Sequence, residues 1–111
     1  MKYLAIVLAL SLVCLLPAQG QPADPGVEII MGRLRWEIDH SQWVQVIAAI
    51  NYTDRVLKNL KVECKFFKNG RLTSTDWSFA HEHNIEPGQM VGVYVRTLGS
   101  PDKADCHWVD E

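Results

Sequence analysis

Apolar and polar residues alternate along most of the chain after residue 26, with a period of two rather than the 3.6 of a helix. The clearest case is 60–67, where Leu, Val, Cys and Phe occupy one set of alternate positions and Lys, Glu, Lys and Phe the other. Successive side chains of a strand point to opposite faces. The pattern therefore predicts a strand with one buried side, which Cys64 shares, and one solvent-facing side.

Six strands of this kind are predicted, separated by turn-forming residues. They cover 27–39, 43–50, 60–67, 72–79, 90–98 and 104–109. No segment carries a helical stripe, and only 54–59 has room for a single helical turn. Short strands at regular spacing predict an all-β fold, built as a sandwich or a barrel.

Two segments are more apolar than alternation alone requires. Residues 27–31 are apolar enough to be covered on both faces, and 43–50 has the nearly continuous β-branched composition of a central strand. Trp36 and Trp108 share strand faces with other apolar residues, so we expect both in the core.

Trp43 and Trp77 are less determined by the pattern. Partial burial at a strand end explains either residue. Alternatively, either could lie on an outer face beside Phe67 or Tyr94, where aromatic rings would form a platform for a sugar or a partner protein.

Three turns have recognisable chemistry. Asn69-Gly70 between two strand patterns predicts a type I′ hairpin, because that turn needs positive φ at both central residues. Pro87-Gly88 favours a second turn. Asn51-Tyr52-Thr53 fits a glycosylation sequon, but we favour a turn in which the Asn51 side chain bonds nearby backbone.

The first 20 residues have the order of a secretory signal peptide. Lys2 precedes an apolar run from Leu4 to Leu16, and small residues end at Gly20. The run is shorter than the roughly 20 residues that span a bilayer, so a cleaved signal peptide is favoured over an uncleaved membrane anchor. The sequence before Cys14 does not resemble a lipidation site. Residues 21–26 are predicted to be a flexible lead-in and 27–111 the folded domain.

Export changes the interpretation of the cysteines. Without Cys14, the chain keeps Cys64 and Cys106, and an even pair in a periplasmic or extracellular protein is usually a disulfide. Two free or metal-bound thiols are the alternative. The formal net charge is −2 and becomes one unit more negative without Lys2, so no basic surface for nucleic acid and no cationic helix for a membrane is expected.

The chain from Val44 to about Trp108 resembles FxLYD-type domains and related exported bacterial domains of immunoglobulin-like fold. The motifs are 46–53, 66–70, in which Phe66-Phe67-Lys68 stands in place of Leu-Tyr-Asp, and 85–88. The resemblance implies a two-sheet immunoglobulin-like sandwich, with the strands of Cys64 and Cys106 adjacent in one sheet. It implies an accessory or adhesion-type module and supplies no catalytic residues.

Candidate chemistry is sparse. His81 and His83 are alternate residues that could reach one metal ion if His40, His107 or a carboxylate completed the site, although solvated side chains explain them equally well. No serine has the setting of a nucleophile, no close carboxylate pair lies in an apolar context, and no phosphate-binding loop is present. We expect neither an enzyme nor a cofactor.

The sequence therefore favours a non-catalytic module that presents a sheet face to a protein partner. The expected surface is the outer side of 60–67, with the Asn69-Gly70 hairpin at its edge. It consists of Lys61, Glu63, Lys65, Phe67 and Asn69. The alternatives are a small hydrolase inhibitor, inserting the loop from His81 to Gly88, and a metal-binding protein using His81 and His83.

Overall fold

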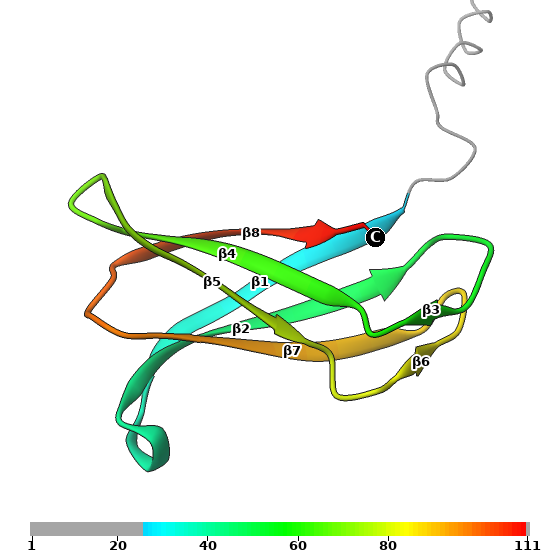
Figure 1. Cartoon of the computed structure of the whole chain (residues 1–111), viewed down its shortest axis with the longest axis horizontal. Helices are drawn as coiled ribbons and strands as arrows, with labels where there is room; N and C mark the ends of the chain where they lie inside the picture. Colours follow the sequence, from blue (N-terminus) through cyan, green and yellow to red (C-terminus); the bar gives the residue numbers. More distant parts are fainter. Residues whose placement is uncertain (1–25, 111) are drawn as a thin grey trace, which may run out of the picture.

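The protein is an all-β sandwich, and the computed structural model describes residues 26–110. Two three-stranded antiparallel sheets, ordered β1-β2-β7 and β5-β4-β8, lie one over the other, and a small β3-β6 ribbon lies at one end (Figure 1). The elements are β1 (Val27–Glu37), a 3-10 turn (Ile38–His40), β2 (Gln42–Asn51), β3 (Leu57–Lys58), β4 (Lys61–Lys68), β5 (Arg71–Phe79), β6 (Asn84–Ile85), β7 (Met90–Thr97) and β8 (Lys103–Val109).

The six long strands are those that the alternation predicts, so the all-β sandwich is confirmed. The segment 54–59 holds β3 instead of a helical turn. The predicted signal peptide at 1–20, and the lead-in except Gly26, lie outside the described residues. Between residues 26 and 110, no helix is long and apolar enough to cross a bilayer.

The core lies between the two sheets, because each strand turns one set of alternate side chains inward. Phe66 is the largest fully buried side chain, and β2 is the central strand of its sheet, as 43–50 predicts. The buried apolar cluster is Ile47, Ala49, Leu57, Leu60, Val62, Cys64, Phe66, Ala80, Ile85, Val91, Val93 and Val95.

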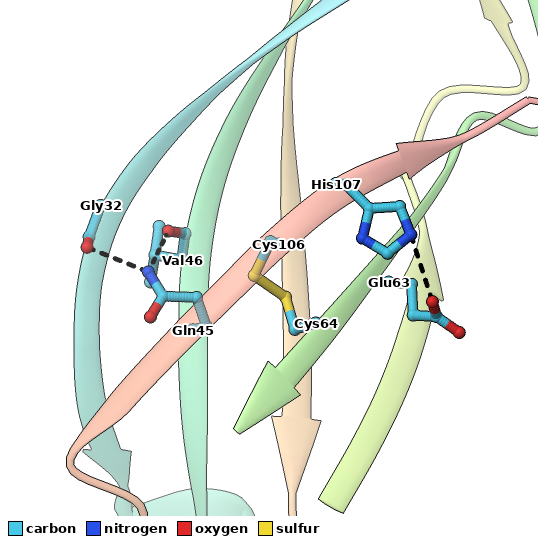
Figure 2. The surroundings of a disulfide bond; sticks show 7 residues. All are labelled: Gly32, Gln45, Val46, Glu63, Cys64, Cys106 and His107. Carbon is cyan, nitrogen blue, oxygen red and sulfur yellow. Dashed lines mark hydrogen bonds and ion pairs between the residues drawn. A yellow bond between two sulfur atoms is a disulfide. The ribbon is translucent and has the colours of Figure 1, made fainter. Parts of the chain in front are cut away.

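Cys64 and Cys106 form the predicted disulfide. They are directly opposite each other on the neighbouring antiparallel strands β4 and β8, with 42 residues of sequence separation (Figure 2). Cys64 is fully buried, and Cys106 packs against the same core. The bridge therefore joins adjacent strands of one sheet from its inward side.

A β-bulge interrupts the pairing of β1 with β2 between Met31 and Leu34. The inward-facing amide of Gln45 donates to the carbonyls of Gly32 and Val46, at 3.0 Å each (Figure 2). A Cβ at Gly32 would lie 2.9 Å from the Val46 carbonyl oxygen. The close approach of the two backbones requires glycine at this position.

The predicted turns at Asn69-Gly70 and Pro87-Gly88 are present. Asn69 and Gly70 have φ of 52° and 79°, as a type I′ hairpin requires. The Asn69 backbone N–H donates to the Asp102 carboxylate at 3.0 Å, which ties this hairpin to the loop between β7 and β8. The second turn is closed by a hydrogen bond of 3.0 Å from the Gln89 N–H to the Glu86 carbonyl, with Gly88 at φ 85°.

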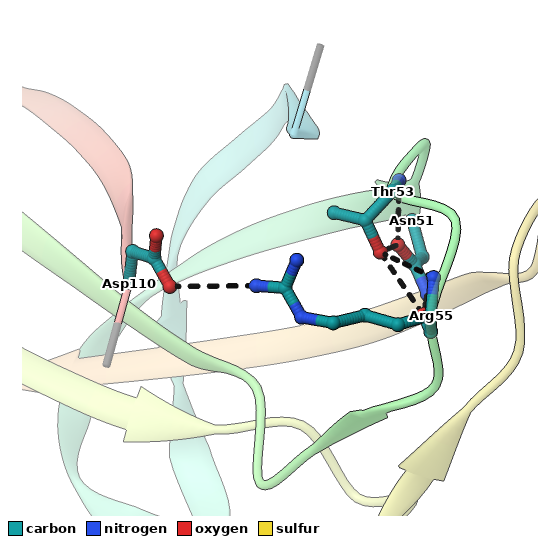
Figure 3. A network of polar contacts seen from close by, with 4 residues as sticks. All are labelled: Asn51, Thr53, Arg55 and Asp110. Atoms are coloured by element: carbon teal, nitrogen blue, oxygen red, sulfur yellow. Dashed lines mark hydrogen bonds and ion pairs between the residues drawn. The ribbon is translucent and has the colours of Figure 1, made fainter. Parts of the chain in front are cut away.

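Asn51 organises the opposite end of the sandwich and has no exposed surface. Its amide donates to the carbonyls of Arg55 and Ile85, at 3.0 and 2.9 Å. Its side-chain oxygen accepts from the N–H and the hydroxyl of Thr53, at 2.9 and 2.6 Å (Figure 3). The prediction of a local backbone-bonding turn is confirmed, and the folded protein offers no access to this nitrogen for a glycan.

The predicted burial of β1 is wrong in two respects. Ile30 is exposed because, among the described residues, no further layer covers the outer face of its sheet, and Met31, on the inward side opposite Ile47, is exposed because β1 is an edge strand. Trp36 is 48% exposed. It lies in the β1–β2 hairpin, which extends past the other sheet (Figure 1), and packs edge-to-face on Trp43 at 6.1 Å between ring centroids. Trp108, in contrast, packs against the core as expected.

Candidate binding face

The outer face of the β5-β4-β8 sheet carries the strongest candidate site. Because Val62, Cys64 and Phe66 point into the core, the alternate residues of β4 point outward. The structure therefore places the four predicted surface residues of this strand together on one face. They are Lys61, Glu63, Lys65 and Phe67, and Phe67 is half-buried among its neighbours.

Strand β5 adds an aromatic pair that the sequence alone did not assign. Trp77 is opposite Glu63, and Phe79 is opposite Lys61. The two rings pack edge-to-face with centroids 5.2 Å apart, yet remain 52% and 44% exposed. The Lys61 ammonium lies 4.4 Å from the centroid of a Trp77 ring, within the range of a cation–π interaction.

In β5 the polar side chains face the core and the aromatic side chains face outward, which is the reverse of the usual arrangement in a β-sandwich. Its inward positions, opposite Phe66, Cys64 and Val62, hold Ser74, Asp76 and Ser78. The Ser74 hydroxyl donates to Asp76 at 3.1 Å and lies 2.7 Å from the hydroxyl of Thr97 on β7. Burial of apolar side chains in the core therefore does not explain the two outward aromatic residues.

A β-bulge at Thr73 produces this reversal. Leu72 pairs with Phe67, and the next pair is Ser74 with Phe66, so Thr73 is an extra residue in β5. Its hydroxyl donates to the Phe66 carbonyl at 3.1 Å. Each one-residue change of register moves the following side chains to the other face of a sheet. If Thr73 instead paired with Phe66 in regular register, Trp77 would lie opposite Val62 and point inward.

The half of the face formed by β4 and β8 is mostly charged. Glu63 pairs with His107 at 3.2 Å (Figure 2). The Lys103 ammonium lies 5.8 Å from the ring centroid of Phe67. Asn69 lies at the end of the face, in the hairpin tied to Asp102. The face thus has aromatic rings at one side and ionic groups at the other.

The two histidines proposed as metal ligands have different neighbours. His83 Nδ1 lies 3.0 Å from the Asn59 side-chain oxygen, and the His81 ring packs against Tyr94 with centroids 6.4 Å apart. His40 and His107 are paired elsewhere, with glutamates on β1 and β4. Within residues 26–110, no three His, Cys, Asp or Glu side chains are grouped closely enough to hold a metal ion.

The loop from His81 to Gly88, proposed for a hydrolase inhibitor, is fixed to the body of the protein at its centre and its end. Ile85 is fully buried, and its carbonyl accepts from the Asn51 amide. The Gly88 N–H donates to the Asn51 carbonyl at 2.6 Å. Only the polar flanks of the loop remain exposed, so its one large apolar side chain is not available for insertion into an active site.

No protein-family model, no curated protein and no solved structure matches this chain. The resemblance to FxLYD-type domains stays a prediction.

Proposed function

We propose that the protein is an exported, non-catalytic binding module that recognises a protein partner with the outer face of the β5-β4-β8 sheet. The observation that carries the proposal is the reversed polarity of β5. This strand directs Ser74 and Asp76 inward and Trp77 outward. Exposing a large ring costs hydrophobic free energy that folding alone does not recover.

The chemistry of the face suits protein recognition. Tryptophan dominates the energetic centres of many protein interfaces, because it buries a large area with little loss of conformational freedom. Here Phe79 and Lys61 fix the Trp77 ring before any partner arrives. The ionic groups around Glu63 and Lys103 would form the polar rim that such interfaces have.

Export fits the same proposal. The leader pattern at 1–20 and the disulfide are both typical of proteins that fold in an oxidising compartment. The similarity to FxLYD-type sequences points to accessory or adhesion-type modules, which act by binding.

A cross-linking pull-down from the native compartment tests the proposal, with Trp77→Ala compared with wild type. We expect Trp77→Ala to weaken capture of the partner by about 30-fold or more, the usual effect at an interface centre. Phe67→Ala should weaken capture to a smaller degree. Trp36→Ala is the matched control, because Trp36 is similarly exposed but lies away from this face. Wild-type capture by Trp77→Ala would contradict the proposal.

A further inference from the structure

The outer face of the other sheet, β1-β2-β7, is apolar and has no layer over it in the described part of the chain. Ile30 and Met90 are 42% and 61% exposed. A groove of about 360 Å³ runs over the centre of this face. Its outward-pointing lining is Ile30, Gly32, Val46, Ala48, Met90 and Gly92.

The strand register arranges the outward residues in four rows across β1, β2 and β7. The first row is Glu28, Ile50 and Met90, and the second is Ile30, Ala48 and Gly92. The third row is the bulge at Gly32, followed by Val46 and Tyr94, and the fourth is Arg35, Val44 and Arg96. In the two central rows, each strand therefore places a smaller residue next to a larger one: Gly32 beside Ile30, Ala48 beside Val46, and Gly92 beside Tyr94.

This arrangement is complementary to itself. Consider a second copy turned by 180° about an axis that crosses the strands between the second and third rows. The second row of one copy then faces the third row of the other. Tyr94 of each copy then lies over Gly92 of the other copy. In the same way, Ile30 of each copy lies over Gly32 of the other, and Val46 of each copy lies over Ala48 of the other. In each strand a larger side chain meets a smaller one, which is the packing that two stacked sheets need at about 10 Å separation.

Charge is complementary under the same rotation. The first row faces the fourth, so Glu28 of each copy lies opposite Arg35 of the other. Both side chains are exposed, and neither forms an ion pair within residues 26–110. The Arg96 guanidinium is already paired with Glu37 at 2.6 Å. Arg35 is therefore the cation in this row that remains for Glu28.

We infer that the occupant of this face is a second copy of the chain, in a symmetric dimer whose β1 strands stack antiparallel. Three strands about 4.8 Å apart, over about seven residues each, give a planar footprint of roughly 330 Å² per copy, which is smaller than a standard specific interface, so we expect weak self-association. The dimer leaves both β5-β4-β8 faces outermost. This inference does not depend on the proposed partner-binding face.

Sedimentation velocity of the purified protein from about 1 to 200 µM tests the inference. We expect a concentration-dependent dimer for wild type. Gly92→Leu should raise the dissociation constant at least tenfold, since the new side chain fills the hollow that receives Tyr94. A Cβ at Gly92 meets no atom within 4 Å and its φ is ordinary, so the backbone accepts a side chain at this position. Lys65→Glu, on the opposite outer face, is the control and should dimerise normally.

Charge reversal tests the orientation of the two copies. Glu28→Arg and Arg35→Glu should each weaken self-association about tenfold, because like charges then face each other. An equimolar mixture of the two variants should form heterodimers, since both contacts become complementary again. Wild type that stays monomeric up to 200 µM overturns the inference and assigns the face to a different occupant. A dimer that withstands Gly92→Leu, or variants that fail to associate on mixing, overturns this interface.

Discussion

The Glu37 carboxylate on β1 accepts two hydrogen bonds from the Arg96 guanidinium on β7, at 2.6 and 3.2 Å. The pair spans the central strand β2, on which Gln42 is opposite Glu37 and the fully buried Val44 is opposite Arg96. His40 Nδ1 lies 3.0 Å from the same carboxylate. These contacts fix the projecting β1–β2 hairpin to the rest of its sheet.

The ion pair between Glu37 and Arg96 makes the stability of the fold depend on pH. The hydrogen bond from Arg96 holds the pKa of Glu37 below its ordinary 4.5. A carboxylate with a lowered folded-state pKa stabilises the fold above its unfolded pKa, and this contribution is lost as the pH falls through the folded pKa. Thermal unfolding between pH 7 and pH 2 should therefore show melting temperatures that decline below about pH 4.5.

Glu37→Gln is the control for this prediction, because glutamine keeps the shape and removes the titration. Its melting temperature should be lower than that of wild type at pH 7, and the two should converge in acid. Parallel curves across the whole pH range would show that Glu37 is not the group responsible.

The disulfide should contribute a large part of the stability. It closes a segment with a sequence separation of 42 residues, for which the loop-entropy model gives about 4 kcal/mol. The Cys64→Ser/Cys106→Ser double variant should lose about that much free energy of unfolding, as measured by urea denaturation. Adding a reductant should lower the urea midpoint of wild type and leave that of the double variant unchanged. A reductant-insensitive wild type would rule out the bridge.

Asn51→Ala should be strongly destabilising, by about 3 kcal/mol. The substitution leaves the buried carbonyl of Ile85 and the N–H of Thr53 without their partners, and each unsatisfied buried group costs about 1–3 kcal/mol. Asn84→Ala, an exposed position on β6, is the matched control with a change expected below about 0.5 kcal/mol. Urea denaturation of the two variants gives the comparison, and equal losses would refute the role given to Asn51.

Two glycines of one sheet should respond differently to the same substitution. Gly32→Ala places a methyl group 2.9 Å from the Val46 carbonyl, whereas Gly92→Ala meets nothing within 4 Å. We expect Gly32→Ala to cost about 1–3 kcal/mol, because backbone has to move. Gly92→Ala should be neutral or stabilising, since alanine narrows the unfolded ensemble. Calorimetric melting temperatures of the two variants should differ in that order.

The strands were predictable because their alternation is a local property. The inward position of Cys64 and the outward position of Lys61 both follow from the period of two in 60–67. Whether an apolar strand face is covered depends on distant segments. The pattern in 27–31 fits a strand buried on two sides equally well as an edge strand with an open side, and the structure has the second.

The candidate face was predictable only in part, for a related reason. The four β4 residues could be grouped from their own strand, but the position of Trp77 beside Lys61 depends on how β5 pairs with β4. Counting pairs back from the Asn69-Gly70 turn without interruption would have turned Trp77 toward the core. Nothing in a single sequence marks Thr73 as the residue at which that count changes.

The bulge at Thr73 therefore sets which side of 74–79 forms the exterior of the molecule. If the bulge closed and Thr73 paired with Phe66, the two sides of 74–79 would be exchanged, so that the hydroxyl and carboxylate side chains would become the visible exterior and the indole would have to compete for interior space. Homologues that lack this one residue would keep the indole outside, because Ser74 would then follow Leu72 directly and still lie opposite Phe66. A deletion at this position would thus smooth the strand and leave its outer wall unchanged.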